Sequence, residues 1–229
     1  MTNNRLAGVI RLHSKDKLSW LLIPWIVVMA SFVVNLVISQ FLEEDLYTGG
    51  VASLYAYMLA IGVISLTNTY PFAIGMGVRR HDYFWGTAAA AAFASLYSAV
   101  VLTVLSYVEY DLTDGWGSGL HFFHVPYLSD GSPLVQVAVY FLLIVNLFFM
   151  GFMTTCVFKR FGILGLLGFA VVMLILGTVA SFIMTKMEWW ADLFDWFNAH
   201  KMLEIALLSV PVTLVFMLVS YALLRRSKA

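Results

Sequence analysis

The chain has 229 residues, of which 62% are hydrophobic and only 11% are charged, and its formal net charge is zero. Soluble domains carry roughly 25% charged residues, so this composition excludes an ordinary soluble domain and indicates a membrane protein. We expect no nucleic-acid partner for it.

Stretches without a charged residue follow one another along the chain, at 18–42, 46–78, 83–108, 131–158, 161–185 and 205–224. Each is long enough for a helix, which rises about 1.5 Å per residue, to cross about 30 Å of hydrocarbon. The runs are continuously apolar rather than alternating, which favours helices over a barrel. The sequence therefore predicts an all-α membrane protein with one transmembrane domain over 1–229. Its six spans are expected at about 18–42, 52–78, 84–108, 133–158, 162–185 and 203–224.

The basic residues are unevenly distributed among the segments between the spans. Eleven of the thirteen lie in the N-terminal segment, in the second and fourth connections and at the C-terminus: Arg5, Arg11, Lys15, Lys17, Arg79, Arg80, Lys159, Arg160, Arg225, Arg226 and Lys228. Only Asp16 and Asp82 of the thirteen acidic residues share that side, so the two sides carry about +9 (11 − 2) and −9 (2 − 11). Short cytoplasmic loops are enriched in Lys and Arg, so both termini are predicted to be cytoplasmic.

Two segments outside the spans have helical periodicity. Residues 3–17 place Leu6, Val9, Ile10 and His13 on one face, which predicts an interfacial helix before the first span. A basic flank that only fixes orientation is the alternative. Aromatic and acidic residues alternate over 187–201, which predicts an amphipathic outer helix between spans five and six. A simple aromatic anchor at the outer interface is the alternative there.

Small residues recur in the third and fifth spans. Ala91, Ser95 and Ala99 follow a small-xxx-small spacing, and the fifth span contains Gly165, Gly168 and Gly177. Such residues let helix backbones approach closely in lipid. Both spans are therefore predicted to pack inside a bundle, against this chain or against a second copy.

The span interiors contain no Asp, Glu, Lys, Arg or His. Buried titrating groups usually drive ion-coupled transport, so their absence disfavours secondary active transport and cation channels with acidic rings. The polar residues Asn35, Asn68 and Asn146 are expected to form interhelical hydrogen bonds or to line a pathway. Cys156, the only cysteine, excludes an intrachain disulfide and is interpreted as a small apolar filler.

The longest connection, residues 109–131, is Gly-rich and is expected to build no core. It contains Ser118, His121 and His124, which suggest either a serine hydrolase or a metal site. Serine catalysis would need the histidine on another span, and a metal site would need a third ligand. A turn-rich loop with surface histidines is the favoured interpretation. The chain also lacks a Gly-x-x-x-x-Gly-Lys motif, so we expect no catalytic site, metal or cofactor on it.

The turn after the second span is more distinctive. Pro71, Gly75 and Gly77 should weaken or bend the helix near its cytoplasmic end. A basic and aromatic run then follows, Gly77-Val78-Arg79-Arg80-His81-Asp82-Tyr83-Phe84-Trp85-Gly86-Thr87. The positive-inside bias explains its arginines but not the Pro/Gly-weakened approach or the aromatic run.

This run resembles the inner turn of the permease subunits of bacterial type-2 ABC exporters. The six spans, the N-terminal amphipathic helix and the helical outer connection between spans five and six are similar as well. The long, acidic third outer segment departs from a minimal member. In that family the turn forms a coupling helix that docks on a separate ATPase.

The resemblance implies a multi-pass permease subunit in the bacterial cytoplasmic membrane, paired with a second copy or a sibling permease. ATP and magnesium would bind to the partner ATPase. The residues that it assigns to docking are Arg79, Arg80, His81, Asp82, Tyr83, Lys159 and Arg160. The uncharged spans suit an amphipathic or hydrophobic substrate such as a peptide, a lipid-like molecule or a drug. The alternatives are a non-transporting sensor or scaffold with the same fold, and an intramembrane hydrolase.

Overall fold

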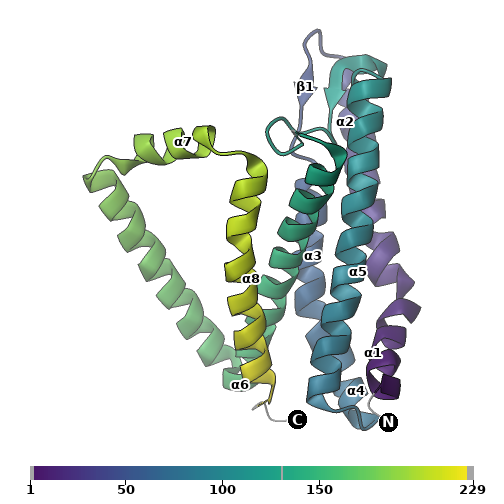
Figure 1. Ribbon diagram of the computed structural model, residues 1–229, viewed down its shortest axis with the longest axis vertical. Coiled ribbons are helices and arrows are strands. Elements are labelled where there is room, and N and C mark those ends of the chain that lie inside the picture. Colours follow the sequence, from purple (N-terminus) through teal and green to yellow (C-terminus); the bar gives the residue numbers. More distant parts are fainter. Residues whose placement is uncertain (1–2, 130, 226–229) are drawn as a thin grey trace.

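The computed structural model of the chain describes residues 3–129 and 131–225, with side chains from residue 6 onward. Arg226 and Lys228, and the side chain of Arg5, therefore lie outside what is described. Helices make up nearly all of the described residues (Figure 1). They are α1 (Asn3–Lys15), α2 (Ile23–Ser39), α3 (Ala52–Ile64), α4 (Tyr70–Gly75), α5 (Arg80–Tyr107), α6 (Pro133–Lys186), α7 (Trp189–Ala199) and α8 (Met202–Arg225).

π-Helical turns extend three of these helices, at Leu18–Leu22 before α2, Ser65–Thr69 between α3 and α4, and Val108–Leu112 after α5. The strands β1 (Leu46–Tyr47) and β2 (Leu120–His121) form a parallel pair in the register Leu46 to Leu120 and Tyr47 to His121. Helices are thus present where the interfacial and the amphipathic outer helix were predicted, at α1 and α7.

Five helical segments within the described residues are long and apolar enough to cross a membrane: Leu18–Ser39, Ala52–Gly75, Arg80–Leu112, Pro133–Lys186 and Met202–Arg225. The prediction of a helical protein with long apolar helices is therefore confirmed. Each of the apolar ranges found in the sequence overlaps one of these segments, and Pro133–Lys186 overlaps two of the ranges.

The helix α6 is broken at Gly162, whose φ of 70° and ψ of −166° are accessible to glycine and strained for other residues. At about 1.5 Å per residue an unbroken helix of 54 residues would be about 80 Å long, far more than a bilayer. The chain instead turns back at Gly162, and the two arms of α6, residues 133–161 and 163–186, diverge from that point (Figure 1).

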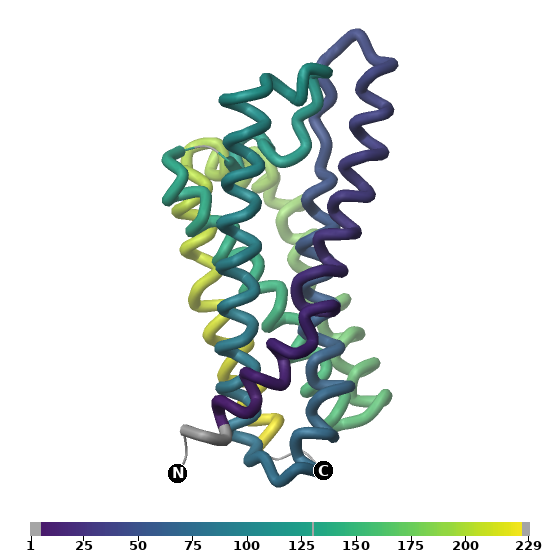
Figure 2. The backbone as a smooth tube through the Cα atoms, turned by 90° about the vertical axis from the view of Figure 1, so that its right-hand side faces the viewer, coloured from purple at the N-terminus to yellow at the C-terminus, as the bar shows by residue number. Residues whose placement is uncertain are grey.

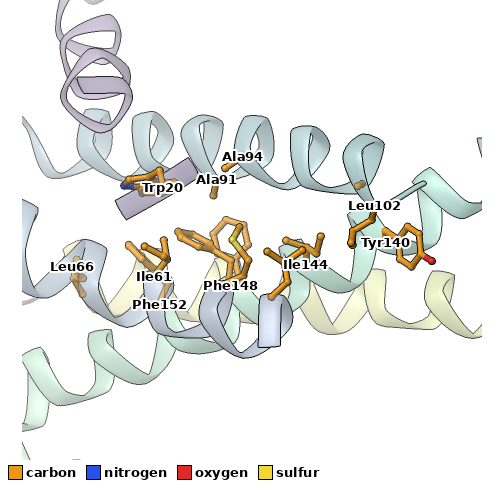
Figure 3. Packing of buried hydrophobic residues seen from close by; sticks show 14 of the residues in the cluster. Trp20, Ile61, Leu66, Ala91, Ala94, Leu102, Tyr140, Ile144, Phe148 and Phe152 are labelled. Atoms are coloured by element: carbon orange, nitrogen blue, oxygen red, sulfur yellow. The ribbon is translucent and has the colours of Figure 1, made fainter. Parts of the chain in front are cut away.

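The core lies between α3, α5 and the first arm of α6 (Figure 3). Ile61, Ala91 and Phe148 are fully buried there, and the rings of Phe148 and Phe152 stack with centroids 6.0 Å apart. Two glycines allow α3 and α6 to meet. A Cβ atom on Gly62 would overlap the backbone oxygen of Phe148, and one on Gly151 would overlap that of Leu59.

The helix α1 packs on α5 instead of lying free at the membrane surface. Val9 is 1% exposed and lies against Gly86, where an added Cβ would come within 2.6 Å of the Val9 side chain. His13 is buried as well, and its Nε2 lies 2.9 Å from the hydroxyl of Thr87. Figure 2 shows α1 crossing the bundle obliquely before the chain continues into α2.

The third and fifth predicted spans differ in their packing. In α5 the small residues Ala91, Ser95 and Ala99 are fully buried, as expected of a packing helix. The second arm of α6 is exposed along almost its whole length, and no atom lies within 4 Å of a Cβ placed on Gly168 or Gly177. Within this chain the fifth predicted span therefore has little packing, and the alternative that it packs against a second copy stays a prediction.

The long outer connection does build a small core, contrary to the prediction. Leu120, Phe122 and Phe123 are at most 1% exposed, and Phe32 of α2 contacts the rings of Phe122 and Phe123 with centroids 5.5 and 5.3 Å apart. We call residues 106–129 with β1, on the side that was predicted to be outer, the outer cap. This Gly-rich segment can build a core because Phe32 of α2 supplies an apolar ring against which Phe122 and Phe123 pack.

Candidate functional site

We call residues 76–87, which were predicted to lie on the cytoplasmic side, the inner turn. It begins where α4 ends in a glycine-capped bend. Gly77 has a φ of +80°, its N–H bonds to the carbonyl of Ile74 at 2.9 Å, and the N–H of Val78 bonds to the carbonyl of Ala73 at 3.1 Å. This pair of bonds is the Schellman motif, which satisfies the last carbonyls of a helix and requires a left-handed residue. The motif turns the chain sharply, and the next helix, α5, begins at Arg80.

Three of the residues predicted to dock a partner in this turn are accessible. The side chain of Arg79 is exposed, and Arg80 donates from Nη1 to the carbonyl of Arg225 at 2.9 Å, which joins the turn to the end of α8. The side chain of His81 is 59% exposed, and its Nδ1 lies 3.5 Å from Oδ1 of Asp82. These residues present a basic surface at the end of the molecule where α1 begins and α8 ends (Figure 1).

Asp82 and Tyr83 face the interior. Asp82 is 7% exposed and Tyr83 is fully buried. The prediction that both contact a partner is therefore corrected, because side chains that pack into the core are not available on the surface. Of the residues predicted to dock a partner in this turn, Arg79, Arg80 and His81 are the ones whose side chains reach the surface.

Tyr83 joins the inner turn to the π-helical turn between α3 and α4. Its hydroxyl donates to the carbonyl of Ser65 at 2.7 Å and lies 2.7 Å from the hydroxyl of Thr69. Ser65 and Thr69 are the two ends of the π-helical turn between α3 and α4. A displacement at the start of α5 therefore acts on a place where the helical hydrogen bonding already changes.

The second predicted docking segment, Lys159 and Arg160, lies close by. The Lys159 ammonium is 5.7 Å from the centre of the Tyr70 ring, and the Tyr70 and Tyr83 rings meet edge to face at 5.1 Å. The structure thus brings the two basic segments together through Tyr70. Arg160 is exposed at the end of the first arm of α6, where its guanidinium lies 6.0 Å from the ring of Phe161.

The three asparagines have different surroundings. Asn146 donates to the hydroxyl of Thr213 at 2.8 Å, which is a hydrogen bond between α6 and α8. Asn35 donates to the carbonyl of Ser31 in its own helix at 2.8 Å. Asn68 is exposed in the π-helical turn. The structure therefore gathers none of them into a common polar pathway within the described chain.

Ser118, His121 and His124 are separated in the outer cap. The hydroxyl of Ser39 donates to that of Ser118 at 2.9 Å, His121 stacks on Tyr47 at 4.4 Å, and His124 Nδ1 lies 3.1 Å from the Ser106 hydroxyl. His121 is 7% exposed, so its description as a surface histidine is wrong. Among the described residues no group of three or more His, Cys, Asp or Glu is arranged to hold a metal ion.

Glu109 organises the cap, a role that the sequence interpretation missed. Its carboxylate is fully buried and accepts N–H groups from the Trp116 indole at 2.7 Å, from the backbone of Phe123 at 3.0 Å and from that of His124 at 2.7 Å. The signal was the first acidic residue after a charge-free run of 26 residues, ahead of an aromatic loop.

Comparison with known proteins adds no relative: no family model, no curated protein and no solved structure matches this chain.

Proposed function

We propose that the protein is the permease subunit of an ATP-driven exporter of the type-2 ABC class, and that a separate ATPase docks on the inner turn. The observation that carries the proposal is the contrast between adjacent residues there. Arg79 and His81 are exposed, whereas Tyr83 is bonded to the Ser65–Thr69 turn of the next helix. A surface contact at this turn therefore reaches the interior within one helical turn.

The mechanism follows from these contacts. ATP and magnesium would be held by the ATPase, and closure of the ATPase would push on Arg79 and His81. The push moves the start of α5, and Tyr83 transmits it to Ser65 and Thr69. Tyr70 contacts both Tyr83 and Lys159, so the first arm of α6 moves with them. Two packed arrangements of these helices would form the bistable element on which ATP binding acts.

The topology that we propose has six spans, with the two arms of α6 crossing separately and both termini in the cytoplasm of a bacterial cell. The break at Gly162 and the basic residues at that end support it. The protein would be a multi-pass component of the cytoplasmic membrane.

A second copy or a sibling permease would complete the assembly. The second arm of α6 is exposed along almost its whole length, although glycines are spaced along it. Small residues in membrane helices allow the backbones of two helices to approach closely. Another permease chain would supply the helix that packs against these glycines. An amphipathic or hydrophobic substrate is proposed for the resulting pathway, because the spans carry no buried charge in their interiors.

The test is a pull-down of the full-length, affinity-tagged protein from its native membrane, with ATPase activity as the readout. The double variant Arg79→Glu, Arg80→Glu should lose the ATPase. A matched control, Arg11→Glu with Lys15→Glu, makes the same charge change on α1 and should retain it. Accessibility labelling should show that both variants keep the wild-type topology. Retention of the ATPase by the Arg79/Arg80 variant would refute docking at this turn.

The outer cap favours one alternative, a non-transporting sensor with the same fold. A polar cavity of about 240 Å³ opens there between Ser106, His124 and Gln136. An ATPase that co-purifies but shows no substrate-stimulated activity would support the sensor. The intramembrane hydrolase has less support, because Ser118 bonds to Ser39. Full activity of a Ser118→Ala, His121→Ala variant would eliminate it.

A further inference from the structure

A second cavity, lined mainly by apolar side chains, lies between α1, the Leu18–Leu22 turn and α5. Its volume is about 430 Å³, and its walls include Trp20, Leu21, Ala90 and Phe93. Ligand pockets in proteins typically measure about 300–1,000 Å³, so this space can accept part of a large molecule. We call it the α1–α5 pocket.

Small residues on α5 create the hollow. Ala90 and Ala94 line it, at positions four residues apart that share one face of the helix. His13 and Thr87 hold α1 against α5 beside it through their 2.9 Å contact. The position of α1, which forms the opposite wall, is therefore fixed. The short alanine side chains leave the space between α1 and α5 unfilled.

The pocket opens on the flank of the bundle. Phe93 and Tyr97 line it and are 77% and 49% exposed. Both belong to the charge-free run 83–108, so this flank faces acyl chains in a membrane. The molecule that can enter from that side is a lipid.

The rim of the pocket is polar and basic. Ser14 and Lys17 line the pocket and both are exposed, and the Ser14 hydroxyl donates to the carbonyl of Ile10 at 2.7 Å, which leaves Lys17 as the free donor. Asp16 is the only acidic residue in this part of the chain, and its Oδ1 accepts the hydroxyl and the N–H of Ser19 at 2.9 and 3.2 Å. Lys17 directly precedes the charge-free run 18–42, so it marks the boundary between headgroups and hydrocarbon.

We propose that the α1–α5 pocket binds an anionic phospholipid, with one acyl chain against Ala90 and Ala94 and the phosphate at Lys17. The apolar wall accounts for the chain and the basic rim for the headgroup charge. The lipid would then fasten α1 to the bundle beside the His13–Thr87 contact. The inference rests on placement in a membrane and not on transport, so it stands or falls separately from the docking of an ATPase.

The experiment uses the full-length protein in nanodiscs of phosphatidylcholine that contain a phosphatidylglycerol with a photoactivatable acyl chain. After irradiation, mass spectrometry locates and quantifies the labelled peptides. We expect the label on the peptides that line the pocket. Ala90→Phe fills the space and should remove most of this label. Ala92→Phe changes the same residue type on the same helix outside the pocket and should leave the label unchanged.

The headgroup is tested with a surface residue that folding does not require. Lys17→Gln should lower the preference for phosphatidylglycerol over an equally photoactivatable phosphatidylcholine by about fivefold, the factor expected for one lysine near an anionic surface. Lys15→Gln, an exposed lysine outside the pocket, should lower it much less. Equal labelling of wild type and Ala90→Phe, or equal effects of the two lysine changes, would mean ordinary annular lipid and would overturn the proposal. The Lys17 comparison remains decisive if Ala90→Phe does not fold.

Discussion

The buried carboxylate of Glu109 should control the stability of the outer cap. It lies in the last helical turn after α5, where the partial negative charge of the helix end disfavours an anion. Three N–H groups offset this, from Trp116, Phe123 and His124, at 2.7–3.0 Å. The substitution Glu109→Gln removes the charge and turns an NH₂ group towards these donors, whereas Glu109→Ala leaves all three without an acceptor.

The magnitudes follow from the value of such bonds. A hydrogen bond to a charged group contributes about 1.5–3 kcal/mol, and an unsatisfied buried donor costs about 1–3 kcal/mol. Relief of the buried charge offsets part of each loss. We therefore expect opening of the cap to become easier by about 2 kcal/mol in Glu109→Gln and by about 4 kcal/mol in Glu109→Ala.

Amide hydrogen exchange measures this opening directly. At about 1.4 kcal/mol per factor of ten, the amides of Phe123 and His124 should lose protection by about 30-fold in Glu109→Gln and by about 1,000-fold in Glu109→Ala. Asp111→Asn is the matched control, since Asp111 is exposed two residues further along and should have little effect. Unchanged protection of Phe123 and His124 in both Glu109 variants would refute the view that this carboxylate organises the cap.

Three further predictions concern the helices. Gly151→Ala should destabilise the protein by about 3 kcal/mol, because its Cβ would overlap the backbone of α3, whereas Gly168→Ala, in open space, should be neutral or slightly stabilising in thermal melts. Burial lowers the pKa of His13 to about 4 from 6.5, so its contribution to stability is complete above about pH 6.5 and declines by up to about 3 kcal/mol towards pH 4. Melts across this range should show a shallower decline in His13→Gln, and an equal decline would contradict the assignment. In a variant without the native cysteine, Gly177→Cys should form an intermolecular disulfide in membranes and Val179→Cys, on the opposite side of the helix, should not. Equal cross-linking at both positions would argue against a specific interface.

The positions of the helices could be read from the sequence because hydropathy is a local property. The run 18–42 became Leu18–Ser39, and the run 83–108 became the apolar part of Arg80–Leu112. The periodicity of Leu6, Val9 and His13 likewise indicated α1 before any contact was known. In each case the chain segment itself carries the pattern that water or lipid selects.

Packing between distant segments could not be read in the same way. The fit of Gly62 and Gly151 depends on which faces of α3 and α6 meet, and hydropathy does not encode that choice. Tyr83 followed two arginines and an aspartate in a polar-looking turn, yet its ring is buried by α4. The core of the outer cap was not predicted for the same reason, since Phe32 completes that core from α2.

The helix α5 connects the three features described above, and its stiffness limits how they can communicate. It has 28 residues, or about 42 Å at about 1.5 Å per residue, and contains no proline. Tyr83 lies at its start, Ala90 and Ala94 at the α1–α5 pocket, and Glu109 just beyond its end. The neighbouring α3–α4 segment is instead interrupted by the Ser65–Thr69 turn and by Pro71 at the start of α4. A force on the inner turn should therefore shift α5 as a unit while the α3–α4 segment bends, and the cap and α1 would move with α5 because Glu109 and the His13–Thr87 contact attach them to it.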